Sequence, residues 1–252
     1  MNNLKLEALL NDFLSPQLMK DYCPNGLQVE GKTEVNKVIT GVTACQALID
    51  RAIAEHADAI LVHHGFFWKG EAAEIRGMKY RRIKALIENG INLYAYHLPL
   101  DVHSQVGNNV QLAQRLGLDI SGGLEINNPR SIAIYGELDT PLTGEEFAAR
   151  IAMALQREPL HIGDNAPALI KKVGWCTGGG QDYIELAVEQ GCDAFISGEV
   201  SERTTHIARE LGIHYFAAGH HATERYGVKA LGEWLAKEHG CDVEFIDINN
   251  PV

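Results

Sequence analysis

The sequence lacks any long uninterrupted hydrophobic run. No stretch of the 252 residues approaches the ~18 consecutive apolar residues of a membrane-spanning helix. Residues 1–7 also lack the apolar core of a secretory signal peptide. We therefore expect a protein of the cytoplasm that has no association with membranes.

Cysteine is scarce and irregularly placed. The five cysteines are an odd number, they are scattered along the chain, and no two of them form a Cys-x-x-Cys pair. This pattern argues against a disulfide framework and against a zinc site built on cysteine, and it is typical of a reducing compartment.

The chain also lacks an excess of basic residues. It has 22 Lys and Arg against 33 Asp and Glu, which gives a formal net charge of -11. Loose binding to a nucleic-acid backbone depends on clustered positive charge. A nucleic-acid partner is therefore possible but not favoured, whereas a nucleotide held through metal ions is compatible with this charge.

Apolar segments and helical segments alternate through the first half of the chain. Short strands are predicted at 38–42, 59–62 and 91–96, and amphipathic helices at 3–14, 46–55, 79–89 and 108–116. This alternation predicts an α/β fold with a parallel sheet.

From Val173 the pattern of the first half repeats. Val38 to Val173 and Asp58 to Asp193 are both 135 positions apart, and a later match, Gly90 to Gly212, is 122 positions apart. We interpret the chain as two related α/β halves, produced by duplication, that face each other across a metal-binding cleft. The expected boundaries are 1–121 for the first half, 122–170 for a connecting segment and 171–252 for the second half.

Side chains of the types that can bind metals follow four predicted strands. They are His63 and His64 after the second strand, His97 and Asp101 after the third, Glu199 in the second half, and His220 with Glu224 after the last strand. Ligands of open α/β sheets bind beyond the carboxyl ends of the strands.

Each of these residues also has a purely structural interpretation. Asp101 could cap a helix, Glu224 could pair with Arg225 on the surface, and His97 could hydrogen-bond a core carbonyl. Their coincidence at four strand ends favours a metal site. Imidazole and carboxylate ligands suit Zn, Fe, Mn, Co or Ni, and a carboxylate can bridge two ions ~3.5–4 Å apart.

Six motifs identify a family resemblance. They are Pro24–Val29, His63–Gly65, His97–Asp101, Thr177–Gly180, Ser197–Glu199 and Gly219–Glu224. Together they resemble the Nif-three-like family, whose members are often labelled GTP cyclohydrolase I type 2 homologues, and the resemblance extends over nearly the whole chain.

The resemblance implies a toroidal homohexamer, arranged as a trimer of dimers, with two divalent transition-metal ions in each subunit. The implied ligands are listed here: His63, His64, Asp101, His220 and Glu224. Glu224 would bridge the ions and His97 would transfer protons beside them. The family lacks a settled substrate, so the residues fix a reaction class more firmly than a target.

The implied activity is hydrolysis of a nucleotide-like substrate, with the C8 carbon of the guanine ring as the target in GTP cyclohydrolase chemistry. Two alternatives remain open. One is a metal-dependent phosphoesterase, and the other is a metal-stabilised ring without catalytic activity that binds a protein or DNA partner.

Overall fold

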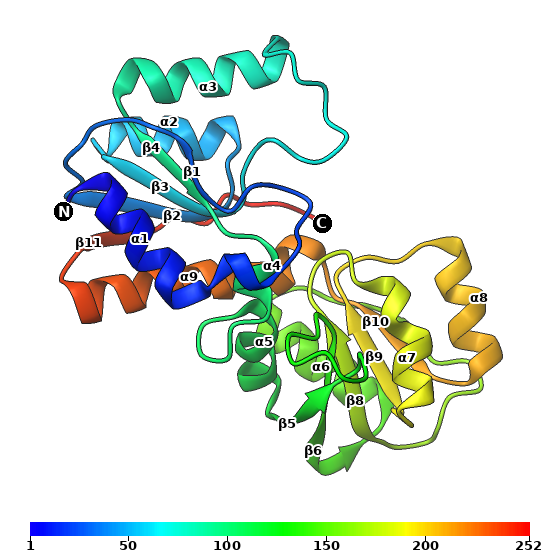
Figure 1. Ribbon diagram of the computed structural model, residues 1–252. Coiled ribbons are helices and arrows are strands. Elements are labelled where there is room, and N and C mark those ends of the chain that lie inside the picture. Colours follow the sequence, from blue (N-terminus) through cyan, green and yellow to red (C-terminus); the bar gives the residue numbers. More distant parts are fainter. The chain divides into compact units, whose positions relative to one another are not determined.

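The computed structural model describes residues 1–252 as two compact units (Figure 1). The first unit comprises residues 1–107 and 227–249, and the second comprises residues 108–226 and 250–252. These bounds differ from the expected boundaries at 121 and 170. Residues 122–170 are no separate connector, because they supply two strands to the sheet of the second unit. The carboxyl-terminal helix and strand also return to the first unit.

A five-stranded sheet forms the centre of the first unit, in the order β1-β4-β3-β2-β11. The strands are β1 (Gly26–Val29), β2 (Lys37–Thr43), β3 (Ala59–His64), β4 (Asn92–Ala95) and β11 (Asp242–Phe245). Only β1 runs antiparallel to its neighbour. The helices that follow or precede them are α1 (Asn3–Leu14), η1 (Pro16–Leu18), α2 (Gln46–Ala54), α3 (Gly77–Asn89), α4 (Leu98–Asp101) and α9 (His220–His239), whose first two turns belong to the second unit.

Both faces of this sheet are buried by helices. Ile60 and Val62 of β3 pack in the cluster that contains α2 and α3, whereas Leu61 packs in the cluster that contains α1 and α9. Figure 1 shows these helices on opposite sides of the sheet. Because successive strand residues point to opposite faces, a continuous apolar run is what a strand buried on both faces requires.

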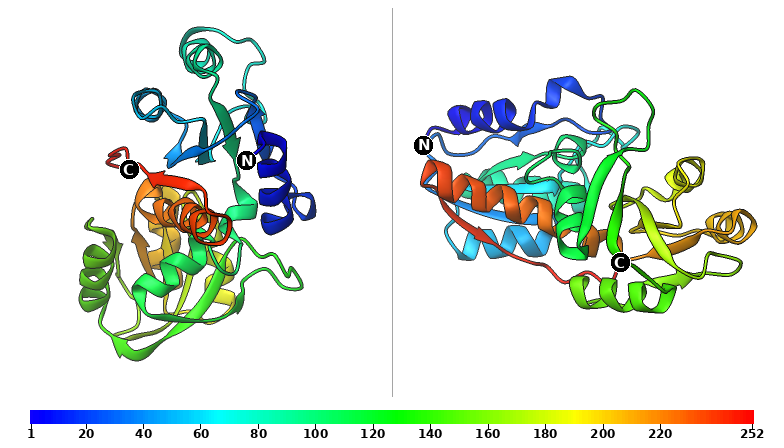
Figure 2. Two further views of the ribbon diagram at one scale, coloured as in Figure 1. Left: turned by 90° about the vertical axis from the view of Figure 1, so that its left-hand side faces the viewer. Right: turned by 90° about the horizontal axis from the view of Figure 1, so that it is seen from below.

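A six-stranded sheet forms the centre of the second unit, in the order β5-β6-β8-β9-β10-β7. The strands are β5 (Leu118–Gly123), β6 (Ile134–Leu142), β7 (Leu160–Ile162), β8 (Ile170–Cys176), β9 (Ala194–Ser197) and β10 (His214–Ala217). The helices are α5 (Asn108–Leu116), α6 (Gly144–Leu155), η2 (Gln181–Tyr183), α7 (Ile184–Glu189) and α8 (Glu202–Leu211). Helices α5 and α6 cover one face, and α7 and α8 cover the other (Figure 2). No helix of either unit is long and apolar enough to cross a membrane.

Strand pairing confirms that the two units contain related halves. In the first unit Val38 pairs with Ala59, and in the second Val173 pairs with Ala194, so both partners have moved by the same 135 positions. Strands β3 and β4 likewise correspond in register to β9 and β10.

An aspartate in the equivalent position supports the first pair of parallel strands in each half. Asp58 accepts hydrogen bonds from the backbone N–H groups of residues 36 and 37, at 3.0 and 3.2 Å. Asp193 accepts from residues 171 and 172, at 2.9 and 2.8 Å. A carboxylate that satisfies two backbone donors at the start of a strand explains why Asp-Ala opens both β3 and β9.

A pair of histidines joins the edge strand β7 to β10. His214 donates from Nε2 to the Pro167 carbonyl at 2.8 Å. A neutral imidazole then has its lone pair on Nδ1, so His161 must donate from Nε2 across the 2.9 Å contact with His214. Burial, and secondly the neighbouring His214, lower the pKa of His161, although Glu145 and Asp164 act in the opposite direction.

This lowered pKa predicts a loss of stability in acid. The unfolded chain takes up a proton on His161 near the ordinary pKa of about 6.5, whereas the folded chain takes it up only at lower pH. The free energy of unfolding should therefore fall as the pH drops from 7 through the folded-state pKa. Urea unfolding at a series of pH values should show a shallower decline for His161→Gln, which keeps an N–H donor but cannot titrate. Equal slopes for the two proteins would contradict this assignment.

Candidate metal-binding sites

His63 is completely buried near the carboxyl end of β3, with 0% of its surface exposed. Its Nδ1 lies 3.0 Å from the carbonyl oxygen of Tyr96. A carbonyl only accepts, so Nδ1 carries the proton and Nε2 keeps the lone pair that a metal ion needs. That Nε2 lies 3.4 Å from Oδ1 of Asp101, the last residue of α4.

Three imidazoles gather around this point of the first unit. One nitrogen from each of the His63, His64 and His97 rings lies within 4.8 Å of the other two. The ring centroids of His63 and His64 are 4.5 Å apart. This closeness is unusual because neighbouring side chains of a strand such as β3 ordinarily point in opposite directions. His64 also lies 3.3 Å from the Thr43 hydroxyl through Nδ1. The first unit thus brings together three of the expected ligands and the expected proton-transfer residue.

His97 has a carboxylate partner that the sequence did not reveal. Its Nδ1 lies 2.6 Å from Oδ1 of Asp21, and both side chains are almost buried. Cys23 completes a second group of potential ligands with them. Burial, reinforced by the charge of Asp21, raises the pKa of the Cys23 thiol to about 12. A thiol that stays protonated is a poor metal ligand, so this second group is a weaker candidate.

The second unit holds the other two expected ligands on one helix face. His220 begins α9 and Glu224 follows one turn later, with 3.0 Å between Nε2 and Oε2. His220 also lies 2.7 Å from Oε1 of Glu199 through Nδ1. Burial would lower the pKa of His220, but the hydrogen bonds and charges of Glu224 and Glu199 raise it to about 9. The sequence marked Glu199 as a strand-end residue without giving it this supporting role.

A glycine makes room for this pair. Gly178 lies in the turn after β8, has a φ of +64°, and donates its N–H to the Thr223 hydroxyl at 3.0 Å. A Cβ atom there would lie 1.9 Å from Oε1 of Glu224 and 2.9 Å from Nε2 of His220. Close packing against the ligand side chains therefore explains Gly178 of the Thr177–Gly180 motif.

The residues present fit divalent metal ions of the transition series. His63 and His220 each engage Nδ1 with a carbonyl or carboxylate oxygen, an arrangement that orients Nε2 toward a metal in many metalloproteins. Asp101 and Glu224 are only 5% and 3% exposed. Burying a carboxylate is costly unless a positive charge accompanies it, and a metal ion supplies that charge.

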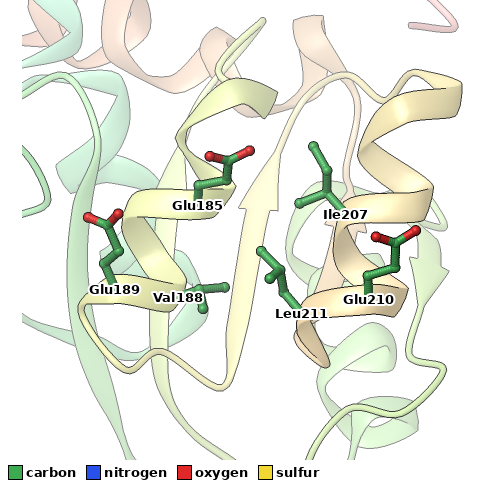
Figure 3. A pocket seen from close by; sticks show the side chains of 6 residues that line it. All are labelled: Glu185, Val188, Glu189, Ile207, Glu210 and Leu211. Carbon is green, nitrogen blue, oxygen red and sulfur yellow. The ribbon is translucent and has the colours of Figure 1, made fainter.

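One cavity of the second unit lacks these donors. It has a volume of about 410 Å³ and lies between α7 and α8 (Figure 3). Its lining comprises Glu185, Val188, Glu189, Ile207, Glu210 and Leu211. No imidazole, thiol or hydroxyl lines this cavity, so it is not a candidate metal site.

Comparison with known proteins identifies relatives over the full chain. The family described as Duf34/NIF3 (NGG1p interacting factor 3) matches residues 1–251. A Vibrio cholerae protein named "GTP cyclohydrolase 1 type 2 homolog" is 70% identical, and a Haemophilus influenzae protein of the same name is 64% identical, each with both chains covered completely. The solved structure of the protein ybgI is 54% identical, covers 100% of both chains and has a TM-score of 0.97. The resemblance inferred from the motifs is confirmed.

The close approach of Gly178 to Glu224 predicts an effect on metal binding. Gly178→Ala should displace the Glu224 carboxylate, because the new Cβ would overlap its Oε1, and metal content per chain should fall. Gly179→Ala is the matched control, since its Cβ would lie 3.7 Å from Glu199, an ordinary contact. Elemental analysis of both purified variants checks this, and full metal content in Gly178→Ala would refute it.

Proposed function

Because the chain belongs to the Duf34/NIF3 family, we propose that it is a metal-dependent hydrolase with two divalent transition-metal ions in each subunit. The five ligands would be the histidines and carboxylates described above: His63, His64, Asp101, His220 and Glu224. Glu224 would bridge the ions, because a carboxylate has two oxygens that each accept a metal. His97 would transfer protons beside them.

The burial of carboxylates beside imidazole nitrogens is the observation that carries this proposal. Oδ1 of Asp101 lies 3.4 Å from Nε2 of His63. Oε2 of Glu224 lies 3.0 Å from Nε2 of His220, and both carboxylates are buried away from most water. Structural zinc sites of the closed type commonly use cysteine, and no thiol contributes to this ligand set. An imidazole and carboxylate set is common in hydrolytic centres that leave a coordination position open.

The bound ions would supply Lewis acidity, which lowers the pKa of water and stabilises negative charge on the substrate. The protein would contribute orientation and proton transfer. Tyr96 and Glu199 would hold the rings of His63 and His220 through Nδ1. His97 would accept the proton from attacking water and pass it to the leaving group.

We propose a nucleotide-like substrate, in line with the name "GTP cyclohydrolase 1 type 2 homolog" that the Vibrio cholerae relative bears. The net charge of -11 favours a small ligand held through metal over a long phosphate backbone. We also propose a cytoplasmic homohexamer arranged as a ring, a trimer of dimers.

One test of the proposed function measures the metal content of the wild type. Protein purified without a histidine tag should contain about two divalent ions per chain, and Glu224→Ala should lose a large part of them because both ions would share this ligand. Circular dichroism and light scattering should show that the variant keeps its fold and oligomeric state. Loss of the fold or of the oligomer in Glu224→Ala would favour a metal-stabilised ring, and absence of metal in the wild type would overturn the hydrolase proposal.

Another test of the proposed function identifies the bond that is broken. Incubation of the metal-loaded protein with GTP should release formate from the C8 carbon without release of phosphate. Glu202→Ala, at an exposed position of α8, should behave as the wild type, whereas His97→Ala should lose about 10²- to 10⁴-fold in rate. Release of phosphate without formate would instead identify a phosphoesterase.

A further inference from the structure

We propose that Asp21 is a positioning residue for His97. In this role it keeps the proton of the ring on Nδ1, so that Nε2 is the nitrogen that accepts a proton during the reaction. The inference rests on the proposed function for its catalytic meaning, but the state of the ring can be measured without any substrate.

The contact itself is short and sheltered. Nδ1 of His97 and Oδ1 of Asp21 are 2.6 Å apart, and the two side chains are 14% and 4% exposed. An ionised carboxylate only accepts hydrogen bonds, so the ring nitrogen must be the donor. Charge-assisted bonds of this length are among the stronger hydrogen bonds in proteins.

The surroundings keep Asp21 ionised. Its Oδ1 also accepts from the Tyr22 N–H at 2.6 Å, and its Oδ2 accepts from Asn25 Nδ2 at 2.9 Å and from the Leu98 N–H at 3.0 Å. Burial acts to raise the pKa of Asp21, but the His97 contact and the donors of Asn25 and Tyr22 outweigh it and lower that pKa. Because four donors surround it, the carboxylate is stabilised in its ionised form.

The same carboxylate also fixes the backbone next to the ring. It accepts from Leu98, the first residue of α4, while Asn25 Oδ1 accepts from the His97 N–H at 2.8 Å. The rings of His97 and Trp68 pack edge to face, with centroids 4.9 Å apart and an angle of 83° between their planes. His97 is therefore held at its backbone, at Nδ1 and at one side of the ring, which leaves Nε2 as its reactive atom.

This arrangement defines the proton-transfer step. An O–H bond of water breaks, its electron pair stays on oxygen, and a new N–H bond forms at Nε2. The resulting imidazolium is stabilised by the negative charge of Asp21, and it later returns the proton to the leaving group. If the proton occupied Nε2 in the resting ring, His97 would have no lone pair facing the reaction.

Nitrogen NMR of the imidazole groups tests the proposal. In the wild type, the neutral ring of His97 should be the Nδ1–H tautomer, assigned by comparison with His97→Gln. Asp21→Asn should shift a measurable fraction to the Nε2–H tautomer, because an amide can present N–H to Nδ1. Asn25→Ala is the matched control: it removes contacts from the same turn but leaves the carboxylate, so the tautomer should not change.

Kinetics separate this proposal from the one on which it rests. Asp21→Asn should keep the wild-type metal content but lose about 10²-fold or more in kcat. An Nε2–H tautomer in the wild type, or a tautomer that ignores Asp21→Asn, would overturn the positioning role even if the protein is a hydrolase. The expected tautomers with no detectable hydrolysis would sustain the positioning role and count against the proposed function instead.

Discussion

A neutral imidazole has one N–H group and one lone pair, and the candidate chemistry of this protein depends on which nitrogen has which. At His63 the Tyr96 carbonyl holds the proton on Nδ1, and at His97 the Asp21 carboxylate does the same. At His220 the carboxylate of Glu199 occupies Nδ1. In every case an oxygen that accepts hydrogen bonds lies on the Nδ1 side, so Nε2 is left for a metal ion or a proton.

These supporting oxygens come from segments that the fold places with little freedom. Tyr96 directly follows the buried strand β4, and Glu199 lies two residues beyond β9. Parallel strands end at one edge of their sheet, so residues just past neighbouring strands are brought together without any local sequence pattern. Precision at the candidate ligands therefore derives from the strand order within each sheet.

The sequence revealed the parts of this arrangement that depend on short-range pattern. Strand β3, the two histidines at its end and the repeat of the α/β unit all follow from periodicity and spacing. Asp21 did not emerge, because it lies 76 residues from His97 and nothing in its neighbourhood marks it. The division into units was also hidden, since a helix that continues from one unit into the other has no turn signal at residue 226.

The repeat shows why duplicated halves need not carry duplicated chemistry. By strand register, His63 and His64 of the first half correspond to Gly198 and Glu199 of the second. A histidine could not replace Gly198, because a Cβ atom there would lie 2.6 Å from Cα of His220. Because the first turn of α9 packs this closely, position 198 of the second half must be glycine, and the next residue, Glu199, contacts His220 through its carboxylate. Steric exclusion at Gly198 thus explains why the first histidine of the pair has no counterpart in the second half.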